Sequence, residues 1–141
     1  MAQAAEDGLV LSADVTQNDD DAACRAAIEA WASNDPAGCD TGIARLELSA
    51  ALLTAADAGA IRVCGVLLGE QGTDINYSDP GPAHERLGQT ALFKAAWRGH
   101  VALVAFLLRH PDVAVNQAER VGKTPLYRAS AYGHAEVVSL L

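Results

Sequence analysis

The sequence contains no run of apolar residues that approaches the roughly 18 needed to cross a membrane. Its opening stretch, MAQAAEDGLV, is acidic, whereas a secretory or mitochondrial leader would be basic. These two absences predict a cytoplasmic protein with no membrane partner, and they leave a nuclear location open.

Cysteines are few and widely separated. Cys24, Cys39 and Cys64 form no CxxC pair, and no histidine lies at metal-ligand spacing from them. Neither a disulfide framework nor a zinc site is therefore expected, and the thiols are predicted to be reduced.

Basic residues are also scarce, since 10 Lys and Arg face 18 Asp and Glu, for a net charge of -8. This acidity argues against binding to nucleic acid, where neutralisation of phosphates supplies much of the affinity. The charge is unevenly distributed: residues 1–60 hold eleven acids and two bases, whereas residues 86–141 hold three acids and seven bases. Such an asymmetry can steer a charged partner, although an ordinary solvated surface is the simpler interpretation.

Sequence motifs of catalysis are missing as well. The chain has no GxSxG, no HExxH, no glycine-rich phosphate loop and no cysteine and histidine set with a known signature. We therefore expect no enzyme activity, cofactor, metal or small-molecule substrate. His100 and His134 are predicted to be buried or helix-capping residues, and His110 a loop residue.

The most informative feature is a repeat. The segments GQTALFKAAWRGHVALVAFLL (88–108) and GKTPLYRASAYGHAEVVSLL (122–141) align at an offset of 34 residues. A third copy, SAALLTAADAGAIRVCGVLLGEQGTDIN (49–76), lies 40 residues before the middle one. The six extra residues fall in SDPGPAHERLG, a stretch whose prolines and glycines indicate a loop, so the helices keep their register. The identities between the last two copies include Gly88 with Gly122, Thr90 with Thr124, Leu92 with Leu126, Ala95 with Ala129, Gly99 with Gly133 and His100 with His134.

The repeated residues are those that turns and helix ends require. Gly122 suits a turn with positive φ, Thr124 can cap a helix with its hydroxyl, Pro125 fits the first helical turn, and Gly133 suits a left-handed helix end. A second helix with one apolar stripe then follows each Gly-His pair or its equivalent. The stripe contains Val101, Val104, Leu107 and Leu108 in the middle copy, and Ile61, Cys64, Leu67 and Leu68 in the first. Cys64 is accordingly predicted to be a small buried hydrophobe and not a nucleophile.

This pattern, a period near 33 with G-x-T-P-L-x-x-A and Gly-His signals, resembles the ankyrin repeat over residues 45–141. The resemblance implies an all-α solenoid of stacked helix-turn-helix units with projecting hairpin loops at residues 39–48, 76–88 and 116–122. It implies three repeats in 45–141, the last incomplete, so that Val137, Val138, Leu140 and Leu141 would face water unless further repeats follow. Phe93 and Tyr127 replace the family's histidine and Leu48 its turn glycine, which predicts a weakened hydrogen-bond network between repeats.

Residues 1–44 are predicted to be degenerate capping helices. One helix is expected in GLVLSADV (8–15) and another in NDDDAACRAAIEAWASNDPAG (18–38). The acids at the start of the second suit a helix N-terminus, and an acid-rich outer face would present a polar surface at the end of the stack.

The resemblance implies a scaffold that binds a partner protein through the concave face of the repeats. The implied contact positions are Asp57 in the first repeat, Arg86, Leu87, Gln89, Trp97 and Arg98 in the middle one, and Arg120, Val121, Lys123, Ala131 and Tyr132 in the last. Trp97, Arg98 and Tyr132 are of the types that dominate binding hot spots, although Trp97 can equally be interpreted as packing on a neighbouring helix. The basic residues predict an acidic patch on the partner.

Two further possibilities remain open. The repeats can be the regulatory or targeting arm of a larger enzyme whose catalytic part lies outside these residues. Asn76 and Asn116 ordinarily bond turn backbone, but the resemblance also makes Asn76 a candidate for asparaginyl hydroxylation.

Overall fold

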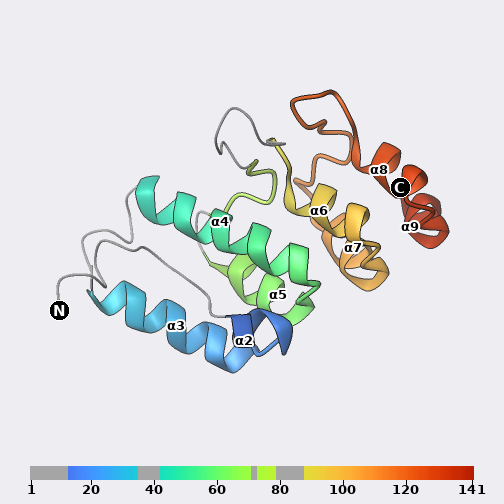
Figure 1. Ribbon diagram of the computed structural model, residues 1–141. Helices are drawn as coiled ribbons and strands as arrows, with labels where there is room; N and C mark the ends of the chain where they lie inside the picture. The colour runs from blue at the N-terminus through green and yellow to red at the C-terminus, as the bar shows by residue number, and fades with distance from the viewer. Residues whose placement is uncertain (1–12, 35–41, 71–72, 79–87) are drawn as a thin grey trace. The chain divides into compact units, whose positions relative to one another are not determined.

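The structure, a computed structural model, describes residues 13–34, 42–70, 73–78 and 88–141. Within these ranges the chain forms eight α-helices and no strand (Figure 1), which confirms the expected all-α class. It divides into two compact units, Met1–Asp74 and Ile75–Leu141. None of the helices in the described ranges is long and apolar enough to cross a membrane.

In its described residues the first unit contains four helices. They are α2 (Ala13–Gln17), α3 (Asp21–Asn34), α4 (Gly42–Ala58) and α5 (Ile61–Gly69). Of the helix expected at residues 8–15, only residues 13–15 are described, and they begin α2. The helix expected in residues 18–38 is confirmed as α3.

Acidic residues tie α3 and α5 together. The Asp20 carboxylate accepts a hydrogen bond from the Ala23 N–H at 3.0 Å, as expected for an acid before a helix. The Asp19 carboxylate accepts one from the Val63 N–H at 3.0 Å, at the start of α5. The Asp19 carboxylate is therefore bonded to a helix inside the unit, whereas the acid-rich segment was expected to form a solvated outer face.

The prediction of a loop at residues 39–48 is wrong for residues 42–48. These residues are helical, because α4 begins at Gly42. Residues 43–58 contain neither glycine nor proline and are rich in alanine and leucine, which favour a continuous helix. Leu48, which occupies the turn-glycine position, is buried with 6% of its surface exposed. Residues 39–41 lie outside the described ranges.

The second unit consists of two stacked helix pairs. The first is α6 (Ala91–Arg98) with α7 (Val101–Leu108), and the second is α8 (Pro125–Ala131) with α9 (Ala135–Leu140). Helix α8 packs on α6, and α9 packs on α7. This stacking of like on like follows from the 34-residue repeat.

The helix ends of this unit are those predicted from the sequence. The Thr90 hydroxyl accepts a hydrogen bond from the Phe93 N–H at 3.2 Å, and Thr124 accepts the equivalent bond from Tyr127 at 3.2 Å. Gly99, with φ of 75°, ends α6 in the left-handed conformation that glycine adopts at least cost.

Burial differs sharply between the two pairs. Leu92 and Phe93 of α6 are 1% and 0% exposed, whereas the equivalent Leu126 and Tyr127 of α8 are 40% and 53% exposed. Helix α8 covers α6, and among the described residues of unit Ile75–Leu141 no element covers the outer side of α8. The expectation that Val137 faces water is wrong, because α9 packs on α7 and Val137 is fully buried.

Candidate interaction surface

The loop before α8 is a tight hairpin, as predicted for residues 116–122. The Gly122 N–H donates to the Glu119 carbonyl at 2.8 Å, and the Glu119 N–H donates to the Lys123 carbonyl at 2.9 Å. Gly122 has φ of 83°, which closes the turn. Arg120 and Val121 therefore form its tip, and Val121 is 68% exposed.

A buried ion pair anchors this hairpin. Oε1 of Glu119 lies 2.9 Å from Nη2 of Arg128 in α8, and the two side chains are 0% and 6% exposed. The other carboxylate oxygen accepts a hydrogen bond from the Gln89 side chain at 3.3 Å. Gln89 is itself buried and accepts from the Lys94 ammonium at 3.4 Å, so the network joins the two helix pairs. The two helix pairs are thus linked at this junction by a polar network, and the expected weakening of the family's own hydrogen bonds stays a prediction.

An aromatic row runs along the same junction. The ring centroids of Phe93 and Trp97 are 6.3 Å apart, and those of Trp97 and Tyr132 are 6.1 Å apart. The Arg128 guanidinium lies over the Trp97 ring at 5.1 Å, and that of Arg98 lies 5.6 Å from the same ring. Trp97 is half-buried and Tyr132 is 53% exposed, so Trp97 packs on the neighbouring pair while Tyr132 presents its ring to solvent.

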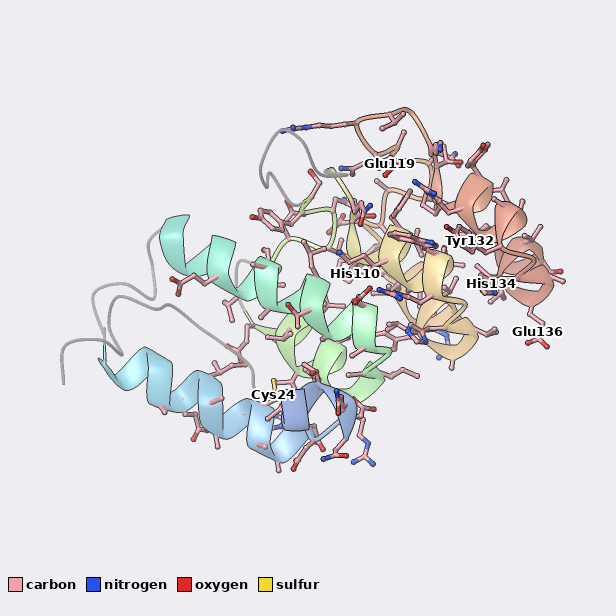
Figure 2. All side chains as sticks on the ribbon, in the orientation of Figure 1. Cys24, His110, Glu119, Tyr132, His134 and Glu136 are labelled. Carbon is pink, nitrogen blue, oxygen red and sulfur yellow. The ribbon has the colours of Figure 1, made fainter. Side chains whose placement is uncertain are left out.

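His134 completes the row beside Tyr132 (Figure 2). The two rings are nearly parallel, with centroids 6.5 Å apart. His134 Nε2 lies 2.9 Å from the Trp97 carbonyl, and because a carbonyl can only accept, this nitrogen carries the hydrogen. The side chain makes no capping bond to α9, so the capping alternative is wrong for His134.

The exposed side chains around the hairpin and at the ends of α6 and α8 are mainly cationic and apolar. Arg98 and Arg120 are exposed, and the Lys123 ammonium lies 5.5 Å from the Tyr127 ring. Between residues 113 and 135 the sequence holds a single carboxylate, Glu119, and its side chain is fully buried.

The structure brings most, but not all, of the predicted contact residues together. Trp97, Arg98, Arg120, Val121, Lys123, Ala131 and Tyr132 lie in the second unit, and all but Trp97 and Lys123 are exposed. Asp57 is a half-buried residue of the first unit. Arg86 and Leu87 lie outside the described ranges.

Asn76 has a structural role between loops. Its amide nitrogen donates to the Asp112 carbonyl at 2.7 Å, and its amide oxygen accepts from the Ala114 N–H at 2.7 Å. The backbone it bonds thus belongs to the following loop. Hydroxylation of Asn76 stays a prediction.

Comparison with known protein families identifies the family of this chain. The family model described as ankyrin repeats (3 copies) matches residues 52–141. The chain belongs to the ankyrin repeat family. A search of the curated proteins found no match.

Ankyrin repeats are in general protein-interaction modules and are typically non-catalytic. In the described residues no three His, Cys, Asp or Glu side chains lie close enough to hold a metal ion. In this ankyrin repeat protein, exposed residues that can contact a partner lie around the hairpin and the aromatic row.

The sequence reasoning missed the Glu119–Arg128 pair. A signal was present, because Arg128 stands in a short helix just before the inward-facing Ala129, and a charge there requires a counter-ion. Glu119 is the single carboxylate in residues 113–135.

Cys24 and Cys64 of this ankyrin repeat protein should be chemically inert while it is folded. Cys24 and Cys64 are fully buried, and burial raises the pKa of the Cys64 thiol to about 12, with the Asp19 carboxylate adding to the shift. At pH 8 a thiol with such a pKa is ionised in only about one molecule in ten thousand, and the thiolate is the reactive form. We expect Cys64 to react with a thiol reagent at pH 8 only as the protein unfolds in urea, measured by mass spectrometry of the labelled peptide. Fast labelling in the native state would contradict this burial.

Proposed function

We propose that this protein is a scaffold that binds a partner protein through the exposed residues around the hairpin and at the ends of α6 and α8. The surface comprises the hairpin tip, Arg98 and Tyr132, with Trp97 at its edge. The observation that carries the proposal is that cationic and apolar side chains are exposed here, while the one carboxylate of residues 113–135, that of Glu119, is buried.

Two physical arguments support this surface. Tyr, Trp and Arg contribute most often to binding hot spots, and a rigid exposed ring such as Tyr132 loses little entropy on binding. Val121 at the tip is the most exposed large apolar side chain in the described residues. The flanking cations favour a partner with an acidic patch, because complementary charges speed association and exclude partners of the wrong sign.

Changing the hairpin tip should remove binding without unfolding the protein. The double substitution Arg120→Glu with Val121→Asp reverses one charge and removes the exposed apolar contact, and both residues are exposed. We expect it to weaken the affinity for a partner identified by affinity capture more than tenfold, with Tyr132→Ala giving a loss of similar size. Arg109→Glu is the matched control, because Arg109 is an exposed cation at the end of α7 and is not part of the proposed surface. Biolayer interferometry with the purified partner measures the affinities, and a tip variant that binds as well as the control would refute this surface.

A further inference from the structure

Glu119 belongs to two structures at once. Its backbone makes both hydrogen bonds that close the hairpin, to Gly122 and to Lys123. Its side chain meanwhile bonds Arg128 in α8 and Gln89 at the start of the preceding repeat. The residue next to the hairpin tip is therefore held from both sides.

Arg128 extends the same connection to the aromatic row. Its guanidinium lies 5.1 Å from the Trp97 ring and 5.9 Å from the Phe93 ring while it contacts Glu119 at 2.9 Å. One ion pair thus joins the hairpin tip to Trp97, although neither member of the pair is exposed.

Stability alone is a poor explanation for this pair. Two charges lose their hydration on burial, and apolar residues of similar volume often replace a buried ion pair without loss of stability. The hydrogen bonding of the pair is also incomplete, because Nε of Arg128 is buried without a hydrogen-bond partner. A planar guanidinium fork does, however, impose a direction that apolar contacts lack.

We infer that Glu119 and Arg128 are positioning residues, which touch no partner but fix the hairpin tip relative to Trp97 and so preorganise the interaction surface. The binding part of this inference rests on the proposed function. Preorganisation raises affinity because less conformational freedom is lost on binding.

The test compares hairpin order with global stability in the free protein. Glu119→Leu with Arg128→Met replaces the pair by apolar side chains and leaves every exposed contact residue unchanged. We expect its thermal midpoint to lie closer to that of the unsubstituted protein than the midpoint of Arg128→Met alone, which leaves Glu119 buried and unpaired. NMR solvent exchange of the Glu119 and Gly122 amides should nevertheless accelerate by about tenfold. The Gly99 amide, which donates to Ala96 in another turn, is the internal reference, and Glu136→Gln is the control for losing an exposed carboxylate.

Two results would overturn the inference. One is that the hairpin amides of the double variant exchange at the same rate as in the unsubstituted protein. The other is that the double variant is as unstable as Arg128→Met, which would show that the pair acts mainly to stabilise the fold. Should the double variant not fold, Glu119→Gln supplies the same amide measurement with a side chain of the same shape. These measurements involve no partner, so they stand apart from the hairpin-tip binding test above. Faster hairpin exchange together with unimpaired binding by the tip variant would refute the proposed surface alone.

Discussion

Replacing Phe93 with alanine is expected to lower the free energy of unfolding by about 3–5 kcal/mol, as large-to-small changes in aromatic core residues do. Phe93 is 0% exposed and is the largest of the fully buried side chains. Its ring meets that of Trp97 edge-on, with centroids 6.3 Å apart, and the Arg128 guanidinium lies 5.9 Å from it. The substitution therefore leaves a cavity and also removes a neighbour of a buried charge. Urea unfolding followed by circular dichroism measures the loss.

Tyr127→Ala is the matched control for this change, because Tyr127 occupies the equivalent position 34 residues later. Its side chain is 53% exposed, since no element in the described part of its unit covers the outer side of α8. We expect its replacement to cost less than about 1 kcal/mol. Losses of equal size at the two sites would show that α8 does not cover α6 as described.

The second large effect is expected at Gly99, where alanine should cost about 2–4 kcal/mol. A Cβ atom on Gly99 would lie 2.6 Å from Nδ1 of His134, closer than real Cβ contacts permit. The His134 ring cannot move without breaking its bond to the Trp97 carbonyl and its stacking on Tyr132. This steric cost adds to the roughly 1–2 kcal/mol that a side chain pays in the left-handed region at φ of 75°. Thermal or urea unfolding gives the total.

Gly133→Ala separates the two contributions to that cost. Gly133 has φ of 74° and follows α8 at the position equivalent to Gly99, but nothing lies within 4 Å of a Cβ built on it. Its replacement should show the backbone cost alone. Removing the His134 ring in the Gly99→Ala background should recover the steric part, as a double-mutant cycle would measure. Equal losses at the two glycines, with no recovery, would contradict the contact between His134 and Gly99.

Features of this protein that depend on neighbouring residues were predictable from the sequence. The hydroxyls of Thr90 and Thr124 cap helices because each lies three residues before the amide it bonds. The hairpin at residues 116–122 likewise follows from its own turn residues. In α4 a local signal was also present, but the repeat alignment suggested a loop where alanine and leucine favour helix.

The polar network of the candidate site was not predictable in the same way. Gln89 and Glu119 are 30 residues apart, and their side chains meet only because α8 stacks on α6. The hydrogen bond from His134 to Trp97 spans 37 residues and depends on the same stacking. A pattern of residue types shows which helices pair, but it does not show which side chains of the stacked pairs point at one another.

The shortness of α8 and α9 has a consequence for how the second unit unfolds. They contain seven and six residues, well below the roughly 12–15 at which isolated helices become marginal in water. In a nearest-neighbour description, the last repeat alone therefore has an unfavourable free energy of folding. Its interface with the preceding repeat contributes the favourable free energy that compensates for this. We therefore expect the two repeats to melt in one cooperative step, with a common stability set by the side chains that cross the junction.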